Sequence, residues 1–332
     1  MFPRYADAEM TYRGKSIKTE LDDYATGITY TDPASSESDT FTLQMADPDE
    51  LWIGPWYPTH GDKITGSITV YNWERAGDTR RVSCGSFTFD DFEPNVGGST
   101  TVSISGVSVP ADDAFGDTPN SKTWEDVTIQ QIAQDIASRA SLTLMYDAGE
   151  VKLESREQSK EPDQSFLDTL CKEYGLSLKV YNDRLVIFDR EQYKAKPTVH
   201  TFTRENTKPA SFRHKLKGTY TGGEIVYTDG DAEEEVKFTL GGGKRIFRMN
   251  EKVDNDADAE RKLRCAVNDA NHEALTVSFS AMGNPDLVAG QTALLSGFKK
   301  LDGKYYINSV THNVRGADYS CSYELSKVYP SI

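Results

Sequence analysis

The chain has 332 residues, of which 37% are hydrophobic and 11% aromatic, so it is long enough to bury the cores of two or three domains. Its formal net charge of −15 argues against a nucleic-acid-binding protein, because such proteins present a basic face to the phosphates, and an acidic surface also repels anionic membranes. The four cysteines are too far apart for a zinc site and too few for a disulfide scaffold. We interpret them as buried thiols of a protein made in a reducing cytoplasm.

No targeting segment or membrane anchor is expected. The N-terminus carries Arg4, Asp7 and Glu9 where a signal peptide needs an apolar stretch. No apolar run approaches the roughly 18 residues of a membrane-spanning helix.

Residues 1–110 follow the period of β-strands that have one solvent-exposed face. Phe41, Leu43 and Met45 alternate with polar residues, and later runs repeat this pattern. At Gly106 the alternation changes phase, which predicts a bulge or a sharp bend. We therefore expect residues 1–110 to form an antiparallel β-domain, either a barrel or a sandwich.

The character of the sequence changes after residues 111–120, which are rich in Pro, Asp and Gly and look like a linker. Within residues 121–195, apolar residues at helical spacing are followed by a short strand, and the same unit returns 34 residues later, from Ile132 to Phe166. Two copies are too few for a solenoid. We expect one small α+β domain with an internal helix–strand repeat, in which Asn182-Asp183 forms a hairpin turn.

Residues 196–332 return to β-character and are predicted to form a second β-domain with one helix at about 256–272. Asp256 can cap this helix, and acidic residues in its first turn suit the helix dipole. The last strand alternates most regularly, because Tyr319 and Leu325 lie on one face and serines lie on the other.

Short segments in a constant order give the chain a resemblance to the baseplate hub family of contractile phage tails, also called the late control D family. The segments are Tyr30-Thr31-Asp32-Pro33, Ala46-Asp47-Pro48 with Trp52 and Trp56, Cys84-Gly85-Ser86-Phe87, Asp90-Asp91-Phe92-Glu93, Ser165-Phe166-Leu167, Val186-Ile187-Phe188 and Gly303-Lys304-Tyr305-Tyr306-Ile307. No single segment is specific. Their order over most of the chain carries the resemblance.

The resemblance implies a mainly β protein in which two tail-tube-like antiparallel β-barrel domains flank the small α+β domain. Three such chains would present six tube-like domains, so a homotrimer could join a sixfold tail tube to a threefold spike. The implied partners are the tail tube protein, the central spike protein and other baseplate proteins, with DNA or an effector passing through the channel without specific binding. The implied location is the tail baseplate of a virion or tail-like particle, assembled in the bacterial cytoplasm. No catalytic residue, metal or cofactor is expected.

Three polar segments have a chemical reading and a structural one. Asp90, Asp91 and Glu93 could supply a carboxylate pair, as in glycoside hydrolysis, but adjacent residues of a strand face opposite ways, so we expect a solvated edge. Residues 229–235 are acidic like a calcium loop but lack its flanking helices, which favours a hairpin tip. Residues 241–245 lack the spacing of a phosphate-binding loop, which favours a flexible loop, and the five histidines show no metal-ligand spacing.

An aromatic segment offers a candidate interface. Trp52, Trp56 and Tyr57 lie among turn residues and could form core, a sugar-stacking platform or a subunit contact, since aromatic residues are enriched at interfaces. Two other functions remain open from the sequence. One is a tail-associated cell-wall hydrolase, and the other is a receptor- or carbohydrate-binding module at the tail tip.

Overall fold

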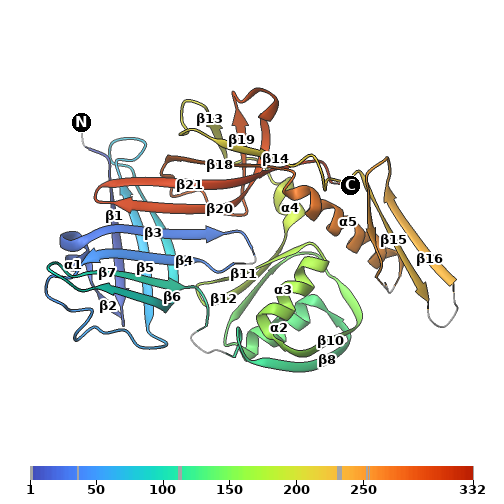
Figure 1. The fold of residues 1–332 in the computed structure, drawn as a ribbon, viewed down its shortest axis with the longest axis horizontal. Helices are drawn as coiled ribbons and strands as arrows, with labels where there is room; N and C mark the ends of the chain where they lie inside the picture. Colours follow the sequence, from blue (N-terminus) through green and yellow to red (C-terminus); the bar gives the residue numbers. More distant parts are fainter. Residues whose placement is uncertain are drawn as a thin grey trace.

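The computed structural model describes residues 3–35, 37–110, 114–229, 234–251, 253 and 255–331. It is mainly β with antiparallel sheets, as the sequence predicts (Figure 1). The N-terminal third consists of β1 (Tyr5–Tyr12), β2 (Lys15–Ser16), α1 (Lys18–Tyr24), β3 (Ala25–Pro33), β4 (Thr40–Ala46), β5 (Lys63–Tyr71), β6 (Thr79–Asn95) and β7 (Thr101–Val107). Within the described ranges, no helix is long and apolar enough to cross a membrane.

The C-terminal strands join the N-terminal ones in a single 13-stranded sheet. These strands are β13 (His200–Thr203), β14 (Ser211–His214), β18 (Leu275–Met282), β19 (Thr292–Ser296), β20 (Gly303–Arg315) and β21 (Asp318–Lys327). The order across the sheet is β14-β18-β21-β20-β3-β4-β7-β6-β5-β1-β2, and β19 links β13 to β20. One continuous hydrophobic core lies under both halves of this sheet.

The strand order of the N-terminal half recurs in the C-terminal half. The N-terminal order β3-β4-β7-β6-β5 is matched by β14-β18-β21-β20-β19, and every neighbouring pair in both series is antiparallel. The outermost strand differs, because β1 runs antiparallel to β5 whereas β13 runs parallel to β19. The two halves are thus repeats in topology over five strands each.

The register of the strands repeats as well. β6 has a bulge between Phe89 and Asp91, and β20 has a bulge at the corresponding place, between Ile307 and Ser309. At the bulge, the Phe89 N–H donates to the Asp62 carbonyl at 2.8 Å, and the Ile307 N–H donates to the Gln291 carbonyl at 2.9 Å. The sequence places the irregularity at Gly106, which lies opposite the bulge; the extra residue is in the partner strand β6.

The small α+β unit repeats a strand, a helix and a strand rather than a helix and a strand alone. The first copy is β8 (Pro119–Thr128), α2 (Ile129–Arg139) and β9 (Thr143–Asp147), and the second is β10 (Lys152–Pro162), α3 (Asp163–Glu173) and β11 (Leu176–Tyr181). β8 pairs with β10, while β9 and β11 flank β12 (Arg184–Asp189), which is followed by α4 (Arg190–Ala195). Asn182 and Asp183 both have positive φ, as the predicted tight hairpin turn between β11 and β12 requires.

The expected linker is shorter than residues 111–120. Residues 111–113 lie outside the described ranges, Phe115 is buried in the core of the α+β unit, and β8 already begins at Pro119. Phe115 is the physical reason, because a large apolar ring gains more from burial than from exposure in a linker.

The C-terminal half also carries an arm that the sequence does not separate from the second β-domain. It contains β15 (Gly222–Asp229), β16 (Glu234–Gly241), β17 (Ile246–Met249) and α5 (Asp256–His272), which lies where the sequence predicts a helix. The cap is Asn255 and not Asp256, because the Asn255 side chain accepts from the Asp258 N–H. The three strands form their own sheet, and this sheet packs on α5 around Leu263 and Val267 (Figure 1). Gly223 allows the close approach, since a Cβ atom there would lie 2.5 Å from Leu263 Cδ1.

Candidate functional site

The seam between the two halves of the sheet is the first candidate site. β20 changes partner at its bulge: residues 303–306 pair with β19, whereas Ser309–Val314 pair with β3 of the other half. Trp73 adds a second link, because its Nε1 donates to the Gly283 carbonyl at 2.5 Å. The C-terminal half thereby adds the end of β20 as a further strand to the N-terminal half of the sheet.

A buried charge cluster, formed by Lys179, Asp32 and Asp39, holds the α+β unit on this seam. Lys179 of β11 forms ion pairs with Asp32 of β3 and, at 2.7 Å, with Asp39 Oδ1. The side chains of these three residues are 13%, 6% and 0% exposed. Asp32 also accepts from the Ala289 N–H at 2.8 Å, so one carboxylate connects β3, β11 and the C-terminal half.

Burial sets the protonation of this cluster. Desolvation and the neighbouring charge of Asp32 raise the pKa of Asp39 to about 6, although Lys179 acts in the opposite direction. Lys179 is itself desolvated, but its two carboxylate partners outweigh this and raise its pKa above the ordinary value. The sequence analysis missed this cluster. The available signal was a lysine inside the apolar strand Leu176–Tyr181.

His312 lies at the centre of the seam, opposite Tyr30 of β3 and Cys321 of β21. Its ring stacks between Tyr30 and Tyr319, and its Nδ1 lies 2.6 Å from the Tyr319 hydroxyl. Burial lowers the pKa of His312 to about 4. The side chain is fully buried, so this histidine fills the core rather than presenting a nucleophile's base to a substrate.

The aromatic segment divides between core and surface. Trp52 is fully buried, and Trp56 packs edge-on against it with the ring centroids 5.4 Å apart. Tyr57 is 58% exposed and contacts Phe92 of β6 edge-on at 5.7 Å. Of the three residues, Tyr57 alone is mostly exposed.

The carboxylates of β6 are all exposed, as expected for a solvated edge. The expectation that Asp90 and Asp91 face opposite ways, as adjacent strand residues do, does not fully apply here. Because the bulge falls at Asp90, strict alternation fails between Asp90 and Asp91. Beyond the bulge, β7 covers one side of residues 91–95, and no strand of the described chain pairs with the other side.

The remaining polar segments hold no assembled site in the described residues. Residues 230–233 of the acidic segment lie outside these residues, and the strands on either side, β15 and β16, form a hairpin. Residues 242–245 connect β16 to β17 without a following helix. No group of three or more His, Cys, Asp or Glu side chains in the described part of the chain could hold a metal ion.

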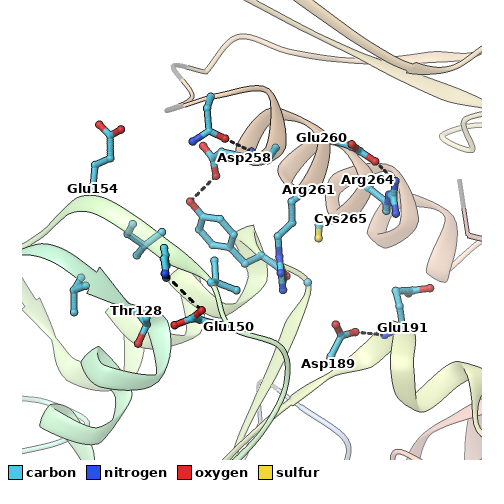
Figure 2. Close-up of a pocket in the computed structure, with 18 of the residues that line it drawn as sticks. Thr128, Glu150, Glu154, Asp189, Glu191, Asp258, Glu260, Arg261, Arg264 and Cys265 are labelled. Atoms are coloured by element: carbon cyan, nitrogen blue, oxygen red, sulfur yellow. Dashed lines mark hydrogen bonds and ion pairs between the residues drawn. The ribbon is translucent and has the colours of Figure 1, made fainter.

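A cleft with a volume of about 1200 Å³ lies between α5 and the α+β unit (Figure 2). Several of its carboxylates have structural partners, whereas none is seen for Asp126 or Glu154 among the described residues. Asp189 caps α4 by accepting from two backbone N–H groups, Asp258 accepts from the Tyr174 hydroxyl at 2.9 Å, and Glu260 pairs with Arg264. Burial raises the pKa of the Cys265 thiol to about 11, which keeps it protonated at neutral pH. Asp189, Asp258, Glu260 and Cys265 therefore supply neither a free carboxylate pair nor an activated nucleophile.

Comparisons with solved structures agree with this architecture. The 43 kDa tail protein of prophage MuSo2 from Shewanella oneidensis has a TM-score of 0.72 at 16% identity, over 97% of this chain and 98% of that chain. A tail protein from Neisseria meningitidis MC58 gives 0.70 at 12% identity, over 97% of both chains. An E. coli component of the type VI secretion system, described as similar to the T4 tail proteins gp27 and gp5, gives 0.61 at 11% identity, over 97% of this chain and 77% of that one.

At these identities the structures establish the fold alone. No curated protein matches the sequence. The family described as the phage tail baseplate hub (GPD) matches residues 62–318, which include β5, β6 and β7, all of the α+β unit and most of the C-terminal half. Because this match extends over more than half of the 332 residues, the chain belongs to the phage tail baseplate hub family.

Proposed function

We propose that three copies of this chain form the hub ring of a tail baseplate, joining a sixfold tail tube to a threefold spike. The observation that most strongly supports this proposal is the repeat of strand order and register between the two halves of the sheet. Two equivalent tube-like barrels per chain give six units in a trimer, which removes the mismatch between the two symmetries.

Other features support this proposal. The seam uses strand pairing, which fixes the position of one half relative to the other more firmly than side-chain contact alone. The charge cluster around Lys179 fixes the α+β unit beside the seam. The net charge of −15 suits a channel through which DNA or an effector passes without binding.

In this proposal the chain works by position and is not an enzyme. It is assembled with the tube, spike and other baseplate proteins in the bacterial cytoplasm and remains in the baseplate of the tail or tail-like particle. Tyr57, at the exposed end of the aromatic segment, belongs to an interface.

The mass of the purified chain tests the ring directly. Sedimentation or native mass spectrometry over a wide concentration range should give three times the 37.0 kDa of the single chain. A stable dimer or tetramer would contradict the proposal. A peptidoglycan zymogram tests the hydrolase alternative, which requires a clearing that we do not expect.

A further inference from the structure

We propose that the unpaired end of β6 in one copy of the chain pairs with the edge strand β14 of a second copy. This inference rests on the proposed ring and names the contact that closes it. The contact would repeat between chains the strand pairing that β20 and β3 make within a chain.

The pairing within the chain provides the template. Beyond its bulge, β20 lies antiparallel to β3, with Thr311 opposite Thr31 and His312 opposite Tyr30. Val310, His312 and Val314 point into the seam and are buried there. β3 is the terminal strand of the N-terminal series, so the donated strand covers an edge that would otherwise be open.

The strands β20 and β3 of the seam correspond to β6 and β14 in the other half of the sheet, and each of these two strands has a side with no paired strand in the described chain. The bulges align Asp91 of β6 with Ser309 of β20. The pairing of β3 with β4 and of β14 with β18 aligns Phe212 of β14 with Tyr30. β14 ends the sheet, and no described strand pairs with its outer side.

Transferring the register of the seam to these counterparts gives a specific ladder. The pair Thr311–Thr31 of the seam corresponds to Glu93 opposite Arg213. The seam pair Ser309–Pro33 corresponds to Asp91 opposite Lys215. Both pairs bring a carboxylate against a cation. Opposite charges at directly facing positions stabilise a strand pair, whereas like charges destabilise it.

Glu93 and Arg213 carry the charge argument. Both side chains are exposed, and neither forms an ion pair with another described residue. Lys215 already pairs with Glu273, so its contribution would require sharing. The opposite charges of Glu93 and Arg213 face each other only when the register of the seam is applied to two copies, because β6 and β14 do not pair within one chain.

The uncovered apolar residues agree with the same register. Phe92 and Val96 occupy the places of the buried Val310 and Val314, yet Val96 is 60% exposed and Phe92 only half-buried. Leu216, just past the end of β14, is 74% exposed. Tyr57 packs on Phe92, which brings the candidate aromatic interface to this edge. Pro94 can offer only its carbonyl, so the ladder has one hydrogen-bond donor fewer than the seam.

The contact joins different surfaces of the two copies, so each copy has one donor edge and one acceptor edge. Such head-to-tail association forms a ring when the rotation closes. Within one chain the C-terminal half donates to the N-terminal half. The proposed contact continues this direction, from the N-terminal half to the C-terminal half of the next copy.

Disulfide trapping with variants that each gain one cysteine tests the contact, with the wild-type chain and its four native cysteines as the background. Full-length chains carrying Glu93→Cys and Arg213→Cys are mixed and oxidised, since directly opposite residues of an antiparallel ladder have Cα atoms about 4.5–5.5 Å apart, within disulfide reach. We expect a covalent dimer from the mixture and background levels from either variant alone. The matched control pairs Glu93→Cys with Ser211→Cys, which lies two residues along β14 and should cross-link less.

Charge exchange gives an independent readout. Glu93→Arg and Arg213→Glu should each reduce the trimer fraction in sedimentation, and the double variant should restore it. A wild-type trimer whose variants neither cross-link nor respond to charge exchange would overturn this contact and leave the ring standing. A wild-type chain that sediments at 37.0 kDa at every concentration would overturn the proposed ring itself.

Discussion

Replacement of Lys179 by methionine is expected to destabilise the junction between the α+β unit and the seam by about 3–5 kcal/mol, the usual cost of removing one partner from a buried ion pair. Methionine preserves most of the side-chain volume, so lost packing contributes little. The change would leave Asp32 and Asp39 facing each other without a cation. Lys179 also donates to the Pro33 carbonyl at 3.0 Å, and that hydrogen bond would be lost too.

Asp39→Asn is the matched control within the same cluster. Lys179 keeps its pair with Asp32, and the asparagine carbonyl can accept from Lys179 in place of Asp39 Oδ1 while the amide donates to the Tyr30 hydroxyl, which lies 2.7 Å from Asp39 Oδ2. Because the pKa of Asp39 is raised to about 6, removing its charge relieves part of the desolvation cost. We expect a loss below about 1 kcal/mol, in the range of one net hydrogen bond.

Native-state hydrogen exchange is the appropriate assay, because a chain with several cores does not unfold in one step. Peptides from β3 and β11 should exchange faster in Lys179→Met than in Asp39→Asn, while peptides from β15 should not change. Equal exchange in the two variants would show that the ion pairs do not hold the junction, and the reasoning from burial would then be wrong.

Two further predictions concern the seam and the arm. His312 is neutral in the fold, because its pKa is about 4 against about 6.5 in the unfolded chain. The free energy of unfolding should therefore be constant above pH 6.5 and fall by about 3 kcal/mol as the pH drops to 4. His312→Phe should lose this share of the pH dependence in urea titrations, and an unchanged profile would contradict the assignment. Gly223→Ala should destabilise the arm by about 1–3 kcal/mol through its clash with Leu263, seen as faster exchange in α5, whereas Gly98→Ala, with open space around it, should have no such effect.

The sequence predicted helices and strands best where one face is buried and the other is exposed to solvent. The alternation of Phe41, Leu43 and Met45 predicted β4, and the apolar stripe that follows Asp256 predicted α5, because both patterns follow from burial of a single face. It failed for β8 and β10. These strands form a two-stranded ribbon with few buried side chains, so their charged sequences carry no alternation.

Pairing between distant strands could not be predicted from local pattern. β20 reads as one continuous strand, and nothing in its sequence states that it changes partner at residue 308. The local pattern also does not reveal the repeat between the halves, which only the family resemblance implied, because the α+β unit and the arm interrupt the two halves at different places. Lys179 was overlooked because its partners, Asp32 and Asp39, lie about 140 residues earlier in the chain.

Averaged electron micrographs of the purified assembly, viewed along its axis, test most directly whether the two halves of the chain act as equivalent units. The account predicts a ring of six similar lobes at low resolution that resolves into three identical pairs at higher resolution. A ring with three lobes, or one in which the two halves of each chain lie at different radii, would contradict it.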